Sequence, residues 1–281
     1  MSKRTVGLAP ARAASAIKTL FLLVLFILYM FPFFMVVLNS LKRDTEVISS
    51  PIALPSSFYW ENYRMAFEKM KFMRAFGNSL IITAASVAAI VLLSSMCAHY
   101  LVRNKTRLST LLYLTMVAAM IIPFQAIMIP LLKIYGSIGM LNNRWVLVFM
   151  YVGFGAPFAI FLFHGFIKAI PRELEEAAII DGCGRYAVFF RIILPLLQPV
   201  IMTVVILDVL WIWNDFLLPS LVLLNQASRT LPLSTYYFYG TYTVNYGCLL
   251  ASLVMTMVPV IILYMFSQRF ILRGIIAGAI K

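Results

Sequence analysis

The sequence predicts an all-α polytopic membrane protein with six transmembrane helices and both termini in the cytoplasm. Of the 281 residues, 63% are hydrophobic and only 12% are charged, whereas soluble domains carry roughly 25% charged residues. Crossing a bilayer core takes about 20 apolar residues in a helix, and runs of this length recur six times along the chain. The basic residues between these runs are distributed unevenly, which indicates the orientation.

The predicted elements form one membrane domain, residues 17–272, between a cytoplasmic N-terminal segment, 1–16, and a cytoplasmic tail, 273–281. The six predicted spans cover residues 17–41, 76–102, 109–132, 145–167, 200–224 and 249–271. Prolines fall inside several of these runs, which membrane helices tolerate because neighbouring groups bond the freed backbone. The first run is too long for a signal peptide and lacks a small-residue cleavage site, so it is expected to stay as an anchor.

The orientation follows from the positions of Lys and Arg. With the N-terminus inside, 14 of the 23 basic residues fall on the cytoplasmic side, and the second and third outer loops hold only Lys133, Arg144 and Arg229. Cytoplasmic loops of membrane proteins carry such an excess. The longest cytoplasmic connection is then residues 168–199. The net charge of +13 is scattered between apolar runs rather than gathered on one face, which argues against a nucleic-acid partner.

The first outer loop is predicted to carry a short amphipathic helix, residues 60–74, that lies on the outer surface. Trp60 and its neighbours Tyr59 and Tyr63 are expected to form part of an aromatic belt at the interface.

The cytoplasmic connection contains the stretch ELEEAAIIDGCGRYAVFFRIILP, which begins at Glu173. Acidic residues in the first turn favour a helix start, and Leu174, Ala177 and Ala178 stand at i, i+3 and i+4 on one apolar face. Gly182 is expected to end this helix before a second one begins. The residues alone allow two interpretations, a helical connector on the membrane surface or a docking surface for another protein.

Seven residues of this stretch follow a longer pattern. They are Glu176, Ala177 and Ala178, then Gly182 after three residues, then Ile192, Leu194 and Pro195 after nine more. This spacing resembles the EAA signature loop of ABC importer permeases. Two further stretches resemble the MalG-like, carbohydrate branch of that family, namely Glu61-Asn62-Tyr63 in the first outer loop and the C-terminal stretch from Gln268 to Lys281.

The resemblance implies an ABC type I importer permease fold with cytoplasmic coupling helices, in a bacterial plasma membrane. It implies that the loop docks into a cytoplasmic ATPase, with close contact at the alanines, a polar contact at Glu176 and a turn at Gly182. The residues expected to serve this coupling are Glu173, Glu176, Ala177, Ala178, Asp181, Gly182, Ile192, Leu194 and Pro195.

The same resemblance implies the partners and the cargo. The expected partners are a homologous second permease, two ATPase subunits and an extracellular or periplasmic solute-binding protein, and the cargo is a sugar or oligosaccharide. The alternatives are an ABC permease for another solute, such as polyamine or phosphate, and an ion-coupled secondary transporter.

No catalytic or metal site is expected in this chain. None of its 13 glycines begins the phosphate-binding pattern GxxxxGK[ST], so ATP and Mg²⁺ are expected on the partner ATPases. Its three cysteines are too widely spaced for a metal site or a disulfide framework. His99 and His164 are expected to be interfacial rather than catalytic.

The fifth predicted span carries two carboxylates in its apolar run. A central Asp costs about 2.5–3.5 kcal/mol on insertion, so these residues need a reason to be there. Asp208, Trp211 and Asp215 stand at i, i+3 and i+7 on one helical face, with Asn214 beside them. They are interpreted either as lining the translocation pathway or as capping broken helix segments and bonding between helices.

Overall fold

The computed structural model describes residues 8–240 and 244–279, and it describes side chains between residues 15 and 266 apart from residues 16 and 241–243. The chain divides into two compact units. The first unit comprises Met1–Met70 and Thr235–Met255, and the second comprises Lys71–Ser234 and Thr256–Lys281. Within the described residues the only extended pairing is an isolated bridge between Tyr239 and Val244.

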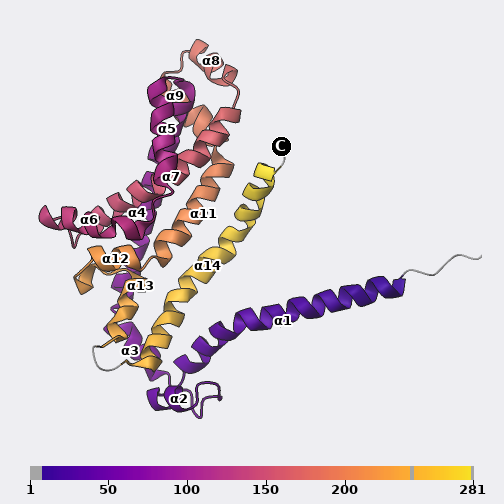
Figure 1. Cartoon of the computed structure of the whole chain (residues 1–281), viewed down its shortest axis with the longest axis vertical. Coiled ribbons are helices and arrows are strands. Elements are labelled where there is room, and N and C mark those ends of the chain that lie inside the picture. The colour runs from indigo at the N-terminus through magenta and orange to yellow at the C-terminus, as the bar shows by residue number, and fades with distance from the viewer. Residues whose placement is uncertain (1–7, 241–243, 280–281) are drawn as a thin grey trace, which may run out of the picture. The chain divides into compact units, whose positions relative to one another are not determined.

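The described chain is helical almost throughout (Figure 1). Its helices are α1 (Leu8–Ser40), α2 (Asp44–Ser49), α3 (Glu61–Lys69), α4 (Phe72–Arg103), α5 (Arg107–Ala119), α6 (Phe124–Ser137), α7 (Arg144–Ala169), α8 (Glu173–Ile180), α9 (Arg185–Val188), α10 (Leu194–Leu196), α11 (Gln198–Asn214), α12 (Leu217–Val222), α13 (Leu231–Ser234) and α14 (Tyr246–Ala279). A π-helical turn, Phe189–Ile193, joins α9 to α10, and the 3₁₀ turns are Gln226–Ser228 and Thr235–Phe238.

Four of the described helices are long and apolar enough to cross a bilayer, namely Ile17–Ser40 of α1, all of α4 and α7, and Tyr246–Phe266 of α14. Two bent pairs reach this length only together. They are α5 with α6, bent by 103°, and Arg185–Leu196 with α11, bent by 75°. These lengths and compositions are those of a multi-pass membrane protein with four spans, or up to six if each bent pair is one span.

The predicted third span, residues 109–132, is sharply bent in the structure, where α5 and α6 reach spanning length only as a pair. α5 ends at Ala119, and α6 begins at Phe124 after a sharp bend. Pro123 explains the break, because it has no backbone N–H and disfavours helical geometry at the residue before it. Pro123 itself is extended, with φ −67° and ψ 136°.

Two other predicted boundaries also move. The predicted fifth span, residues 200–224, divides at Asp215, whose backbone is extended between α11 and α12. The predicted surface helix 60–74 ends at Lys69, and Lys71 has a left-handed φ of 52° before α4 begins. A non-glycine residue with positive φ interrupts a helix.

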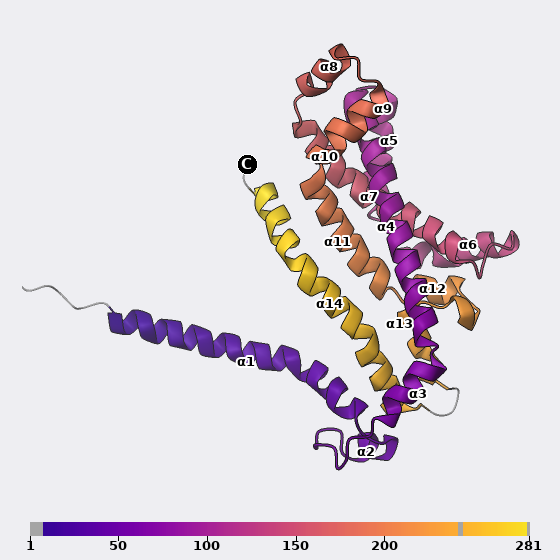
Figure 2. The same ribbon diagram turned by 180° about the vertical axis from the view of Figure 1, so that it is seen from behind.

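The second unit is built on α4, α7 and α11, which pack against one another (Figure 2). Small side chains are buried where α4 and α7 meet, as is usual between membrane helices that approach closely. Gly155 on α7 is one such position, because a Cβ added there would lie 2.6 Å from Ile90 Cδ1 on α4. Ile90, Tyr151 and Phe163 are fully buried in this core.

The two ends of the second unit differ in their elements. α8 and α9 lie at one end, and α12 and α13 lie towards the other (Figure 1). At the α12–α13 end, Asn78 of α4 donates from Nδ2 to the carbonyls of Ala227 and Arg229, at 3.0 Å each. Asn142 Oδ1 accepts from Asn225 N at 2.9 Å. Neutral amides therefore hold the loop before α13 in place.

The first unit is organised around Asn62 of α3. Its buried side chain donates from Nδ2 to the carbonyls of Ser40 and Lys42, at 2.9 and 2.7 Å. Ser40 is the last residue of α1 and Lys42 follows it closely, and carbonyls at a helix end lack helical partners. Tyr63 adds a hydrogen bond between its hydroxyl and Ser40 Oγ at 2.7 Å. The Glu61-Asn62-Tyr63 stretch therefore has a structural role that fixes how the chain leaves α1.

Candidate functional site

The predicted coupling stretch forms a helix–turn–helix at one end of the second unit (Figure 2). α8 is followed by a four-residue turn, by α9 and by the π-helical turn that leads to α10. The expectation of two short helices joined by a glycine turn is therefore confirmed. Pro195 is the second residue of α10 and lies in its first turn, where a proline is tolerated.

Gly182 ends α8 in a Schellman motif. Its φ is 85°, in the left-handed region that favours glycine. The Gly182 N–H donates to the Ile179 carbonyl at 3.0 Å, and the Cys183 N–H donates to the Ala178 carbonyl at 2.9 Å. These two bonds satisfy carbonyls that the helix end would leave free. Gly184 differs, because its φ of −70° is open to any residue.

Glu175 fastens α8 to the end of α4. One carboxylate oxygen, Oε2, lies 2.9 Å from His99 Nε2, and the other, Oε1, accepts from Arg103 Nε at 2.6 Å. Arg103 also donates from a terminal nitrogen to the Ile170 carbonyl at 3.1 Å. The side chains of Glu175 and Arg103 are only 10% and 16% exposed. A charge-assisted hydrogen bond between such largely buried groups is stronger than a neutral one. We refer to Glu175, His99 and Arg103 as the α8 clamp.

The clamp decides which face of α8 is free. Glu175 and Ala178, three residues apart, are buried, whereas Glu173, Glu176 and Ala177 are exposed. Both alanines were expected on one apolar face in contact with an ATPase, and in the structure Ala177 is exposed while Ala178 faces inward. Ala178 is 7% exposed and packs inside the chain, because the clamp turns the i and i+3 positions inward.

The exposed part of α8 carries Glu173 and Glu176 together with the apolar side chains of Leu174, Ile179 and Ile180. Glu176 has one ionic contact, with Arg172 at 3.2 Å, and both side chains are more than half exposed. A surface pair of this kind contributes about 0–1 kcal/mol, so Glu176 remains available to a partner. Asp181 is also exposed at the end of α8.

The second half of the stretch is anchored by apolar residues. Phe189 and Ile193 are buried in the core, and Leu197 is fully buried where α11 begins. Ile192 and Leu194 are half-buried, and Pro195 is exposed. The apolar part of the signature therefore connects the turn to the core.

The two carboxylates of the fifth span lie in different environments. Asp215 Oδ2 accepts from the Tyr151 hydroxyl at 2.9 Å, and Asp215 Oδ1 accepts from the Leu217 N–H at 2.9 Å. This geometry is that of a residue capping the start of α12. Asp208 is 4% exposed, and its Oδ2 atom has no hydrogen-bond partner among the described residues.

The neighbours of these acids differ from them in exposure. Trp211 is 42% exposed and meets the Tyr151 ring edge-on, with centroids 5.6 Å apart. Asn214 is exposed and bonds the Leu210 carbonyl of its own helix at 2.7 Å. The helical face predicted from the spacing therefore presents Trp211 and Asn214, while Asp208 is buried.

The α8 clamp is the part of this site that the sequence did not identify. Glu175 was not among the predicted coupling residues, and His99 was expected to be interfacial. One signal was available in retrospect. Glu175 lies three residues before Ala178, so it shares the inward face of α8 with that alanine. From there it can pair with the basic residues at the end of α4. The side chains of the C-terminal stretch from Gln268 to Lys281 lie outside the described residues.

Comparison with known proteins identifies the family of this chain. Residues 90–277 match the family model described as the binding-protein-dependent transport system inner membrane component. The chain is 44% identical over 259 residues to a probable starch degradation products transport system permease of Thermoanaerobacterium thermosulfurigenes, covering 92% of this chain and 94% of that protein. It is 34% identical over 259 residues to a multiple sugar-binding transport system permease of Streptococcus mutans, covering 91% and 93%.

Solved structures show the same fold. One is a chain of a bacterial ABC transporter involved in the import of the acidic polysaccharide alginate, which has a TM-score of 0.79 at 20% identity and covers 95% of this chain and 99% of that chain. Another comes from the alginate ABC transporter in complex with an alginate pentasaccharide-bound periplasmic protein, with a TM-score of 0.67 at 15% identity and coverage of 92% and 94%. The fold is therefore that of an ABC importer permease.

Proposed function

The chain belongs to the family of binding-protein-dependent transport system inner membrane components, and from this membership we propose that it is the permease subunit of an ATP-driven ABC importer for sugars or oligosaccharides. The named relatives that support the cargo are permeases for starch degradation products and for multiple sugars, and both align over more than nine-tenths of this chain. The chain itself performs no bond chemistry in this role. It forms part of the route through which the solute passes.

The proposed topology counts each bent pair of helices as one span, which makes six. Both termini then lie in the cytoplasm of a bacterial cell, and α8 to α10 face the cytoplasm, in agreement with the excess of Lys and Arg on that side. The partners are a second, homologous permease, two cytoplasmic ATPase subunits that hold ATP and Mg²⁺, and a solute-binding protein outside the membrane. The alginate complex with its periplasmic protein supports the last of these by its fold.

The observation that carries the proposal is that α8 has one face bonded to α4 and one face exposed. One face is fastened to α4 through Glu175, and the other face presents Glu176 and Ala177 to the outside. A docked ATPase contacts the free face, with close approach at Ala177 and a polar contact at Glu176. Since the clamp ties α8 to α4, a displacement of α8 moves a helix of the core.

This linkage gives a mechanism for alternating access. ATP-driven closure of the ATPases displaces the segment from Glu173 to Pro195, and the displacement tips the core helices between outward-open and inward-open states. Rigid-body switching between two packed arrangements is how such transitions generally occur. Gly182 and Asp181 shape the turn, and Ile192 and Leu194 hold its far side against the core.

The proposed solute contacts are on α11. Trp211 offers an exposed ring on which a sugar can stack, and Asn214 offers an amide. Asp215 shapes the break that follows, since both of its oxygens are engaged within the chain. Asp208 is the remaining pathway candidate, and its buried carboxylate needs a hydrogen-bond donor or a proton.

The test compares two glycines that are two residues apart. Gly182→Val places a β-branched residue at a φ of 85° and should prevent the turn, whereas Gly184→Val places it at −70° and should be tolerated. In a pull-down from membranes, Gly182→Val and Glu176→Lys should lose the ATPase while the spans stay inserted. Gly184→Val should keep it.

Two results would contradict the proposal. One is that Gly182→Val and Glu176→Lys hold the ATPase as firmly as the parent chain. The other is sugar uptake that survives depletion of ATP but collapses with an uncoupler, since this is the behaviour of an ion-coupled transporter.

A further inference from the structure

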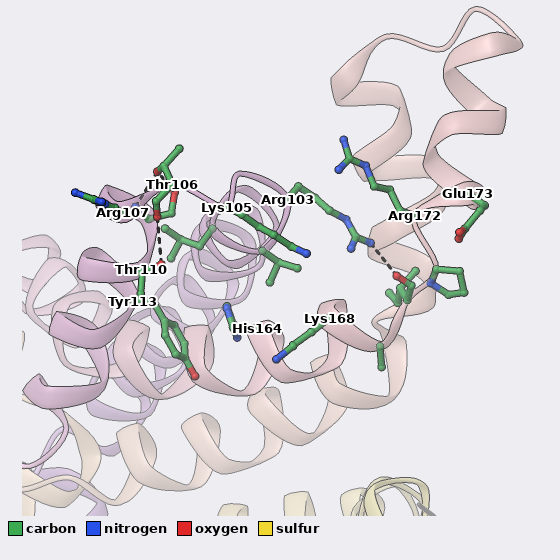
Figure 3. A pocket seen from close by; sticks show the side chains of 16 residues that line it. Arg103, Lys105, Thr106, Arg107, Thr110, Tyr113, His164, Lys168, Arg172 and Glu173 are labelled. Carbon is green, nitrogen blue, oxygen red and sulfur yellow. Dashed lines mark hydrogen bonds between the residues drawn. The ribbon is translucent and has the colours of Figure 1, made fainter.

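The second unit contains a cavity of about 770 Å³ at the level where three helices end or begin (Figure 3). It lies between the end of α4, the start of α5 and the end of α7. Its lining includes one carboxylate and five permanently basic side chains, namely Glu173 against Arg103, Lys105, Arg107, Lys168 and Arg172. A cavity with this balance of charge favours an anion.

The basic side chains divide into engaged and free groups. Arg103 belongs to the α8 clamp, and Arg172 contacts Glu176. Lys105, Arg107 and Lys168 take part in none of the ion pairs found among the described residues. Figure 3 shows Lys105 and Lys168 reaching from different elements into the same space. Two ammonium groups that face one space without a counter-ion repel each other, so an anion between them stabilises both.

The rest of the lining suits a phosphate group. Thr106 and Thr110 lie at the start of α5, which carries partial positive charge. There Thr106 Oγ1 accepts from the Ser109 N–H at 3.1 Å, and the Thr110 hydroxyl donates to the Thr106 carbonyl at 3.2 Å. His164 stacks on Tyr113 with ring centroids 3.9 Å apart and an interplanar angle of 19°, and this pair closes one wall. The cavity therefore combines cationic, hydroxyl and aromatic groups.

An apolar stripe continues from the rim of the cavity along α5. Leu111 and Leu114 follow Arg107 at i+4 and i+7, so all three share one side of the helix. These leucines are 61% and 55% exposed. An anion-binding rim above an exposed apolar stripe matches the shape of a phospholipid, whose charged headgroup lies at the interface and whose acyl chains lie along the helix.

We infer that this cavity binds the phosphate group of an anionic phospholipid, between Lys105 and Lys168, with the acyl chains along Leu111 and Leu114. Basic pockets between membrane helices are known to hold such headgroups. The site lies beside the α8 clamp, with Arg103 and Arg172 in its wall. A bound lipid therefore lies against Arg103, one of the residues that orient α8.

The experiment uses the full importer in nanodiscs that contain equal amounts of phosphatidylglycerol and phosphatidylcholine. Native mass spectrometry then measures the lipids that stay bound. The parent protein should retain phosphatidylglycerol preferentially, and Lys105→Gln with Lys168→Gln should lower that retention by about tenfold or more. Glu173→Gln removes the one carboxylate of the lining and should raise it.

The matched control removes two exposed lysines elsewhere, Lys18→Gln with Lys133→Gln, and should leave the retention unchanged. Equal retention of the two lipids, or an equal loss in the control pair, would overturn the inference, because the lysines would then act only through general surface charge. A parallel arm adds millimolar inorganic phosphate. If phosphate binds with no preference between the lipids, the ligand is a soluble phosphate and the lipid assignment is wrong.

Discussion

The two ends of the second unit are held together by different chemistry. At the α8 end, Glu175 makes charge-assisted contacts with His99 and Arg103. At the α12–α13 end, Asn78 and Asn142 bond backbone groups of the loop before α13 with neutral amides. Both contacts at the α8 end pass through one side chain, Glu175, whereas the amide bonds at the other end are divided between Asn78 and Asn142. The α8 end should therefore fail abruptly on a single substitution, and the other end should weaken by degrees.

The largest effect is expected from Glu175→Ala. The change leaves the Arg103 guanidinium, 16% exposed, without its carboxylate, and removing one partner of a largely buried pair costs about 3 kcal/mol. Hydrogen exchange should show faster exchange of the α8 amides. Sugar uptake per ATP hydrolysed should fall by about tenfold or more, because coupling free energies of about 1–3 kcal/mol correspond to about 5–150-fold. Glu175→Gln keeps an acceptor and should lose less. Full coupling in Glu175→Ala would show that α8 transmits motion by another route.

A smaller effect is expected at the opposite end from Asn78→Ala. It removes two hydrogen bonds to backbone carbonyls, and the freed carbonyls cost about 2 kcal/mol where they are buried. Thermal unfolding should begin at a lower temperature, while uptake per ATP hydrolysed stays near the parent value. Asn104→Ala is the matched control, because Asn104 is exposed and bonds only the Tyr100 carbonyl one turn away. If both substitutions shift unfolding equally, the amide network does not stabilise that end.

Between the two ends, Tyr151→Phe tests the break in α11. The change deletes the 2.9 Å bond from the Tyr151 hydroxyl to Asp215, and a bond of this kind between membrane helices contributes about 1 kcal/mol. Unfolding in mixed micelles should register a loss of that size. A loss as large as that of Asn78→Ala would place Asp215 among the main supports of the unit rather than at a local cap.

The smallest effect is expected from Arg172→Gln. Arg172 and Glu176 are 66% and 59% exposed, and exposed pairs one helical turn apart contribute about 0.3–0.5 kcal/mol. Stability should be unchanged within error, and ATPase capture should persist because Glu176 stays free. Loss of capture would mean that Arg172 contacts the ATPase itself.

Much of the helical architecture could be predicted from the sequence, because apolar run length and glycine geometry are local properties. Four predicted spans overlap helices that are long and apolar enough to cross a bilayer, and the turn at Gly182 has the backbone expected of it. Hydropathy reports how apolar a segment is and not the direction of its helix axis. It could therefore not detect the 103° bend at Pro123 inside a continuous apolar run. The sequence left two roles open for Asp215, a helix cap and a residue that lines the pathway.

The candidate site was predictable only in part. The spacing from Glu176 to Pro195 located the segment, and it did not say which way α8 faces. That depends on the contacts of Glu175 with His99 and Arg103, which lie 76 and 72 residues away in sequence. The orientation of α8 is set by these distant partners and is a tertiary property, so local periodicity could not separate the exposed Ala177 from the buried Ala178.

The first unit joins the two halves of the chain at Gly247. Its N–H donates to Asp44 Oδ1 at 2.8 Å across 203 residues of sequence, and a side chain there would collide with Asn62. A ribosome adds roughly 5–20 residues per second, so about 10–40 s pass between synthesis of these two partners. During that interval the segment between α1 and α4 has been synthesised, but Asp44 does not yet have this hydrogen bond. The contact that Asp44 makes with Gly247 therefore forms only after α14 has begun to be made.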